Sequence, residues 1–177
     1  RFGQEFPLLV KFIDAREDLS IQVHPDDELA RKRHGKSGKC EMWYVLEAEP
    51  GASLLTGFSR PIAPAEYERR VADNTLTDVL NRQAIASGDV FYLPAGRVHS
   101  IGKGSFIVEI QQSSDITYRI YDFDRRDAAG NSRELHTELA REAIDFESSE
   151  NSRITYAPEN NQEVRLVGEA QAAQMPQ

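Results

Sequence analysis

The 177-residue sequence has a single cysteine, Cys40, and no excess of positive charge. One cysteine excludes a disulfide within the chain and fits a reducing compartment, so we expect a cytoplasmic protein. The formal net charge of -8 gives no support to nucleic-acid binding, which usually needs a basic face. There is no apolar run of about 18 residues and no charged-then-apolar segment at the front, so we expect neither a membrane span nor a signal peptide.

The two ends of the sequence do not resemble the ends of a complete domain. The chain opens on Arg1, and the strand-like stretch "EFPLLVKFIDA" follows almost at once. The closing stretch "GEAQAAQMPQ" has no apolar pattern. We therefore expect a segment of a longer protein, in which residues 1–147 form one core and residues 148–177 begin a C-terminal region or tail.

Short strand patterns dominate the chain. Apolar or alternating runs predict strands at 7–13, 19–24, 40–48, 52–58, 89–93, 97–101, 105–112 and 116–121. Three helical regions interrupt them: a helix from Pro25 to His34, two short helices within 63–81 broken near Asn74, and a helix within 132–146 capped by Ser132. The sum predicts a mainly β domain, a sandwich or barrel of antiparallel strands with short helical insertions.

The stretch "GDVFYLPAGRVHSI" carries the first chemical signal. A lone histidine on a strand is usually structural. Here, however, Gly88, Pro94, Gly96 and His99 have the spacing of the second signature motif of the cupin superfamily, which they resemble. The resemblance implies a cupin-type double-stranded β-helix barrel, or jelly-roll, that holds a metal ion, with this histidine as a ligand.

A second group of candidate ligands lies nearer the start of the chain. Gln22 and His24 are two residues apart on a predicted strand, so both side chains point to the same face. Glu41 lies on a hydrophobic strand, where an unpaired carboxylate would be costly. With His99 these groups suit a divalent ion, and zinc is the leading candidate. The alternative is that Glu41 forms a buried ion pair with Lys39 or with an arginine.

Four stretches, taken in order, identify a narrower family. The stretches "FPLLVKFIDAREDLSIQVHPDD", "GKCEMWYVLEAEPGA", "LPAGRVHSIG" and "EIQQSSDITYRIYDFDR" resemble the zinc-binding core of class I mannose-6-phosphate isomerases, most closely the short bacterial form. The resemblance implies a cupin fold, one zinc ion per site, and interconversion of mannose 6-phosphate and fructose 6-phosphate. It also implies that the zinc ligands are Gln22, His24, Glu41 and His99.

Such an isomerisation moves a proton between C1 and C2 through an enediol, so it needs proton transfer and charge stabilisation. By resemblance, Arg119 is the active-site arginine, and it either stabilises the enediolate or contacts the phosphate. Glu109 is the candidate for proton transfer, because it is a carboxylate on an apolar strand. Lys39 resembles an active-site lysine that binds phosphate or adjusts the acidity of a neighbour. The alternative for Glu109 and Arg119 is a structural ion pair between them.

The sequence therefore predicts a zinc-dependent sugar-phosphate isomerase. Its expected partner is a small sugar phosphate, with no nucleic acid and no membrane, and the expected assembly is a monomer or homodimer. A competing hypothesis is a metal-stabilised cupin that binds a sugar or sugar phosphate without catalysis. A third is another metal cupin, such as an iron dioxygenase, against which the glutamine ligand and the order of the motifs argue.

Overall fold

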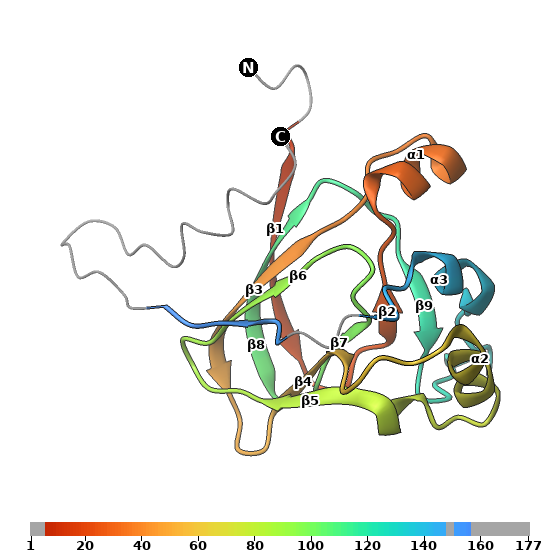
Figure 1. Ribbon diagram of the computed structural model, residues 1–177. Coiled ribbons are helices and arrows are strands. Elements are labelled where there is room, and N and C mark those ends of the chain that lie inside the picture. The colour runs from red at the N-terminus through yellow and green to blue at the C-terminus, as the bar shows by residue number, and fades with distance from the viewer. Residues whose placement is uncertain (1–5, 148–150, 157–177) are drawn as a thin grey trace.

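Two five-stranded antiparallel sheets form the body of the molecule (Figure 1). The computed structural model describes residues 6–147 and 151–156. The first sheet has the order β1 (Leu8–Ala15), β8 (Ser105–Gln112), β3 (Glu41–Ala48), β6 (Val90–Leu93) and β10 (Arg153–Ile154). The second has the order β5 (Leu80–Ala84), β4 (Ser53–Phe58), β7 (His99–Ile101), β2 (Ile21–Val23) and β9 (Tyr118–Tyr121). This is the predicted mainly β, cupin-type architecture.

One apolar core lies between the two sheets. It is built by inward-facing residues of both, namely Ala15, Trp43, Val45, Leu54, Phe91, Leu93, Ile101 and Ile107. The alternating burial along β8 shows the pattern clearly, because every second residue from Ser105 to Gln111 is buried. Trp43 at the centre is fully buried and makes an edge-on contact with the His99 ring.

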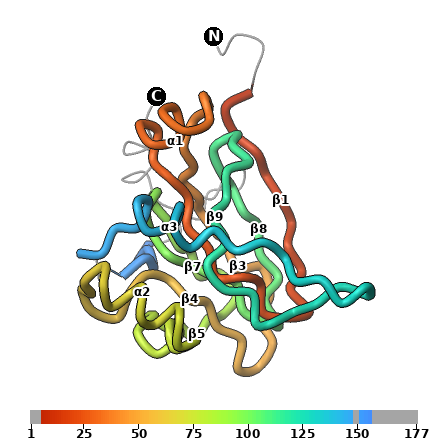
Figure 2. Tube along the Cα trace, turned by 90° about the vertical axis from the view of Figure 1, so that its right-hand side faces the viewer, coloured from red at the N-terminus to blue at the C-terminus, as the bar shows by residue number. Residues whose placement is uncertain are grey.

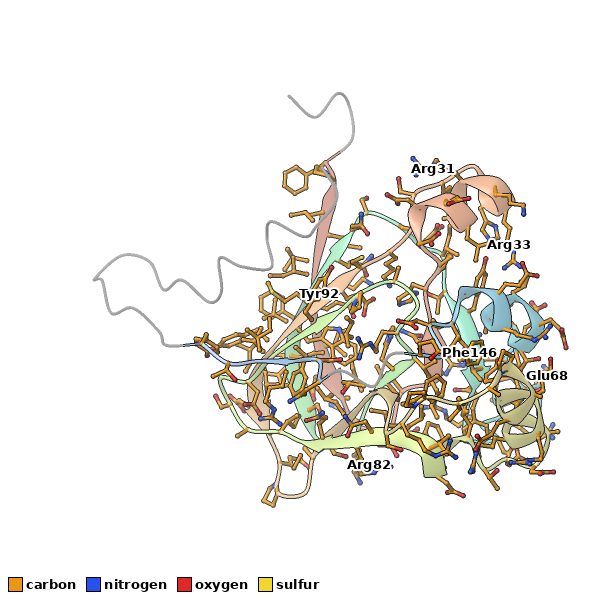
Figure 3. The ribbon with its side chains drawn as sticks, in the orientation of Figure 1. Arg31, Arg33, Glu68, Arg82, Tyr92 and Phe146 are labelled. Carbon is orange, nitrogen blue, oxygen red and sulfur yellow. The ribbon has the colours of Figure 1, made fainter. Side chains whose placement is uncertain are left out.

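A second core lies on the other face of the β2-containing sheet, under the helices. The helical elements are α1 (Asp27–His34), α2 (Pro64–Ala72), the 3₁₀ turn η1 (Leu76–Val79) and α3 (Thr137–Ala143). In Figure 2 the helices lie on the left and β1 on the right. Phe146 lies near α2 and α3 (Figure 3). Its ring stacks on that of Phe58, with ring centres 6.1 Å apart, and meets the Tyr67 ring edge-on at 5.7 Å.

These two cores explain the alternation in the sequence around β2. Ile21 and Val23 are fully buried in the core under the helices. The intervening Gln22, and His24 just after the strand, therefore project from the opposite face, into the space between the sheets. Polar side chains that are buried between the sheets need polar partners there, because burying an unpaired polar group is costly.

Helix α1 begins at Asp27, two residues later than the predicted start at Pro25. Asp26 is the residue before the first turn, and its side chain accepts a hydrogen bond from the Leu29 amide at 2.8 Å. Pro25 therefore precedes the helix. Gly35 ends the helix in the left-handed conformation, with φ of 66°, as the sequence predicts.

Two other helix predictions need correction. The predicted second helix of 63–81 is only a 3₁₀ turn, and residues 80–84 are strand β5, paired with β4. The helix predicted to begin after Ser132 starts at Thr137, because the backbone of Ser132 pairs with Arg126 in a β-bridge. The cap position is His136, whose side chain caps nothing.

Strand β10 was not predicted from the sequence, and it pairs with β6 at the edge of the first sheet. The apolar stretch "EVRLVG" lies outside the described residues, and the boundary at residue 147 stays a prediction. Among the described residues, no helix is long and apolar enough to cross a bilayer.

Candidate metal centre

Strand register places four polar residues in one row across the inner face of the β2-containing sheet. His99 on β7 pairs with Thr56 on β4 and with Gln22 on β2. Gln22 in turn pairs with Arg119 on β9. The amide nitrogen of Gln22 lies 3.3 Å from His99 Nε2. Four residues that are far apart in the sequence therefore lie side by side in one row.

Glu41 faces this row from the other sheet. It is the first residue of β3 and is fully buried. Its Oε1 lies 3.1 Å from His24 Nε2, and its Oε2 lies 3.5 Å from His99 Nε2. One ligand atom from each of these three residues lies within 4.8 Å of the others. Three of the four predicted ligands thus form one buried cluster, with Gln22 beside it.

Both histidines are oriented by backbone carbonyls. His24 Nδ1 lies 2.9 Å from the Ile116 carbonyl oxygen, and His99 Nδ1 lies 2.7 Å from that of Arg97. A carbonyl oxygen only accepts, so each Nδ1 carries the hydrogen, and the Nε2 of each neutral imidazole presents a lone pair. This is the arrangement by which outer contacts orient metal-binding histidines.

The electrostatics of the cluster fit a cation. His24 Nε2 and both Glu41 oxygens are buried and have no well-aligned hydrogen bond among the described residues. Each Nε2 lone pair faces a carboxylate oxygen, and two acceptors do not satisfy each other. A positive ion between them would, and the nitrogen, nitrogen and carboxylate donors suit a divalent transition metal. The residues present therefore fit a metal ion.

Lys39 also belongs to this cluster. Its Nζ lies 2.6 Å from Glu41 Oε1, and its side chain is buried. The predicted alternative of a Glu41–Lys39 ion pair is thus formed alongside the histidine contacts, rather than in their place. Burial raises the pKa of the Glu41 carboxyl, but the protonated forms of His24 and His99, together with Lys39, outweigh burial and hold that pKa well below its usual range. Burial also lowers the pKa of His99 to about 4.

Glu109 lies on β8, next to the cluster, but its carboxylate accepts hydrogen bonds from residues outside the cluster. Its Oε1 accepts from Lys11 Nζ at 2.9 Å, and its Oε2 accepts from Trp43 Nε1 at 3.0 Å. Arg119 instead donates from Nη1 to the Glu134 carbonyl oxygen at 3.0 Å. The alternative of a Glu109–Arg119 ion pair is therefore wrong, because Lys11 holds the carboxylate from the neighbouring strand β1.

A cleft opens beside the metal cluster. It has a volume of about 460 Å³, and its lining includes Gln22, Trp43, His99, Arg119 and Arg133. The cleft reaches the solvent and ends at two candidate metal ligands, so a small molecule in it would meet the ion. Arg119 therefore lines the same cleft as Gln22 and His99.

Sequence reasoning missed Arg133 and its partner Asp122. Asp122 is buried and accepts hydrogen bonds from two arginines, Arg125 at 2.6 Å and Arg133 at 2.7 Å. The only available signal was the number of arginines after β9. Lys11 was also missed, because its contact with Glu109 depends on the pairing of β1 with β8.

A sandwich of two antiparallel sheets with a buried His–Glu–His group between them defines a metal-binding protein of the cupin type. Comparison with known proteins narrows this class. Residues 1–59 match the family described as "Phosphomannose isomerase type I, catalytic domain". The chain belongs to the type I mannose-6-phosphate isomerase family, as its sequence motifs predict.

Individual relatives agree with this assignment. The chain is 44% identical over 143 residues to a probable mannose-6-phosphate isomerase of Bacillus subtilis, covering 80% of the chain and 45% of that protein. It is 44% identical over 139 residues to the mannose-6-phosphate isomerase of Streptococcus mutans, covering 78% and 44%. The crystal structure of a Bacillus subtilis mannose 6-phosphate isomerase superposes with a TM-score of 0.84 at 35% identity, covering 94% of this chain and 54% of that one. The chain thus spans about half the length of these relatives.

Proposed function

We propose that this chain carries the metal-dependent site of an aldose–ketose isomerase that interconverts mannose 6-phosphate and fructose 6-phosphate through an enediol. The observation that supports this most strongly is the buried group of His24, Glu41 and His99, whose candidate ligand atoms lie within 4.8 Å of one another and whose His99 lines an open cleft. Relatives named as mannose-6-phosphate isomerases supply the reaction and substrate. The free, buried Cys40 is consistent with a cytoplasmic location, which is part of this proposal.

We propose zinc as the ion, with Gln22 as the fourth ligand. Rotation of the Gln22 amide by half a turn exchanges its nitrogen and oxygen, and so presents the oxygen toward His99 and the cluster. Two imidazole nitrogens, a carboxylate and an amide oxygen suit a borderline divalent ion. When bound, zinc would act as a Lewis acid toward the C1 and C2 oxygens of the sugar.

The surrounding residues would supply the other requirements of the reaction. Arg119 keeps its charge at any ordinary pH, so it suits stabilisation of a negative substrate oxygen or of the phosphate. Lys39 sets the charge balance at Glu41, with which it is in direct contact. Glu109 is our candidate for proton transfer, because it is a buried carboxylate held against Trp43, whose ring meets His99.

The test is conversion of fructose 6-phosphate to mannose 6-phosphate after chelation and after zinc is restored. His99→Ala should lose both the bound zinc and the turnover. His34→Ala is a matched control, because that histidine bonds the Tyr118 hydroxyl at 2.8 Å and lies outside the metal cluster. Zinc bound at one ion per chain without turnover would support the alternative, a metal-stabilised cupin that binds sugar phosphate without catalysis. Unchanged turnover in His99→Ala would contradict the proposal.

A further inference from the structure

Arg119 lies on β9, which is the last strand of the second sheet in the described part of the chain and pairs there with β2. The free side of an edge strand presents backbone groups that need partners from outside the sheet. At Arg119 one residue supplies both partners. The Arg119 amide donates to His136 Nδ1 at 3.2 Å, and the Arg119 carbonyl oxygen accepts from the His136 amide at 2.7 Å. His136 therefore takes the place of a strand neighbour at this one position.

The same short segment also holds the Arg119 side chain. Arg119 Nη1 donates to the carbonyl oxygen of Glu134 at 3.0 Å. On its other side, Arg119 is the register partner of Gln22, and both residues line the cleft beside the metal cluster. Residues 134–136 thus bind the backbone and one end of the guanidinium of a residue that lines the cleft.

The His136 side chain is used for Arg119 rather than for its own helix. His136 precedes the first turn of α3, a position where Ser, Thr, Asp and Asn are preferred because their side chains accept from the first turn. Within the described part of the chain, His136 makes no such bond to α3. The helix instead holds its backbone, because the Ala140 amide donates to the His136 carbonyl oxygen at 2.8 Å. Helix α3 therefore fixes the position of His136 and leaves the imidazole for Arg119.

The contact requires one particular tautomer of His136. A backbone amide only donates, so His136 Nδ1 presents a lone pair, and in the neutral ring Nε2 carries the hydrogen. This Nε2 lies 3.8 Å from Glu134 Oε2, and the ring lies beside that of Tyr118, with ring centres 6.4 Å apart. The tautomer is the opposite of that of His24 and His99, whose Nδ1 atoms face carbonyl oxygens.

We propose that His136 is a positioning residue for Arg119, and that its Nδ1 acceptor holds this part of β9 where the guanidinium lines the cleft. A hydrocarbon side chain in its place would leave the Arg119 amide without its acceptor. The importance of Arg119 for the reaction rests on the proposed isomerase function, but the position of Arg119 can be measured without turnover.

Two amide side chains distinguish the two ring nitrogens. The oxygen of an asparagine can stand near the position of Nδ1, whereas the longer glutamine places its oxygen near that of Nε2. His136→Asn should therefore keep the acceptor, His136→Gln should misplace it, and His136→Leu should remove it. NMR of the zinc-loaded chain measures hydrogen exchange at the Arg119 amide and at Arg119 Nε. We expect exchange about 3- to 10-fold faster in His136→Gln and His136→Leu, the value of one neutral hydrogen bond, and near the wild-type rate in His136→Asn.

His34→Ala is the matched control, because His34 bonds the hydroxyl of Tyr118, the preceding residue on β9, at 2.8 Å. It should leave hydrogen exchange at Arg119 at the wild-type rate. The nitrogen-15 spectrum of the histidine rings is a second measurement, made on wild type, so it does not depend on whether a variant folds. It should show His136 Nδ1 without a hydrogen and Nε2 with one when the ring is neutral.

Where turnover is measurable, kcat/KM for fructose 6-phosphate should fall by a similar factor in His136→Gln and return in His136→Asn, which a general loss of packing would not produce. The expected exchange pattern in a wild type without turnover would support the positioning role while the isomerase function fails. Equal exchange in wild type and His136→Gln, equal acceleration in all three variants, or a hydrogen on Nδ1 of the neutral ring would overturn the role, even if wild type is an active isomerase. Faster exchange with unchanged kcat/KM in an active enzyme would also overturn it.

Discussion

Gln22 on β2 and Arg119 on β9 are directly opposed across two neighbouring strands. A register shift between Ile21 and Gln22 immediately precedes this pair. Because a one-residue change of register turns side chains to the other face of a sheet, this irregularity decides that Gln22 and Arg119 share the inner face. The candidate metal ligand Gln22 and the candidate active-site residue Arg119 are therefore positioned by the same backbone pairing.

Trp43 should report metal binding. It is the only tryptophan in the chain, and its ring centre lies 5.4 Å from that of His99. We expect zinc to change the intrinsic fluorescence and the change to saturate at one ion per chain. Glu41→Ala should abolish the response, whereas Glu68→Ala, at an exposed salt bridge with Arg141, should retain it. An identical response in Glu41→Ala would show that the ion binds elsewhere.

Metal removal should lower the melting temperature. An ion present at about a thousand times its dissociation constant adds roughly 4 kcal/mol to the free energy of unfolding, which corresponds to roughly 10 °C for a chain of this size. Calorimetry before and after chelation measures the difference. The same treatment should leave His99→Ala unchanged. A chelator effect of equal size in both proteins would place the stabilising ion outside the cluster.

Gly38 should be intolerant of a side chain. A Cβ there would lie 2.4 Å from the Asp26 carbonyl carbon and 2.7 Å from the Pro25 carbonyl oxygen, both of them backbone atoms. We expect Gly38→Ala to lower the free energy of unfolding by about 1–3 kcal/mol. Zinc affinity should fall as well, because the loop leads directly to Glu41. Urea unfolding and zinc titration measure the two effects, with Ser37→Ala as the control. Unchanged stability would mean that the loop relaxes freely.

Asp122 should contribute stability that depends on pH. Burial raises its pKa, but hydrogen bonds from Arg133 and Arg125 outweigh burial and keep the pKa below its ordinary value. A carboxyl whose pKa is lowered by folding stabilises the folded state above its unfolded pKa, and this contribution is lost as the pH falls through the folded pKa. Asp122→Asn should therefore cost about 1–3 kcal/mol at neutral pH, and less below about pH 4.

Urea unfolding at several pH values tests this dependence. Asp124→Asn is the control, because Asp124 lies two residues away and, within the described part of the chain, forms no hydrogen bond or ion pair with either arginine. A stability difference between wild type and Asp122→Asn that stays constant from neutral to acidic pH would contradict the ionic role of Asp122.

Much of the fold could be predicted because its signals are local. Strand alternation, the acidic first turn of α1 and Gly35 each act within a few residues, and the corresponding elements are present. Strand β5 was missed because "LNRQA" has no β-branched residue, and it becomes a strand through pairing with β4. Ser132 was misassigned as a helix cap because its β-bridge with Arg126 closes a loop that no local pattern indicates.

The candidate site also has a part that the sequence predicted and a part that it did not. Motif spacing was enough to select His24, Glu41 and His99, which the fold brings together. The partners of the charged residues depend on contacts across the sheets and loops. Glu109 is paired with Lys11, from a strand 98 positions away in sequence, and Asp122 is paired with Arg133 across a long loop. Sequence spacing carries no information on either pair.

The separation of the candidate ligands between two sheets has a thermodynamic consequence. Glu41 belongs to one sheet, and Gln22 and His99 belong to the other. An ion held by all of them would crosslink the two sheets. The affinity of the site for the ion therefore depends on how firmly the core holds the two sheets at a fixed distance from each other. Coupling between two equilibria is reciprocal, so core substitutions such as Leu54→Ala should weaken zinc binding without touching a ligand. Zinc affinity is therefore also a measure of packing between the sheets.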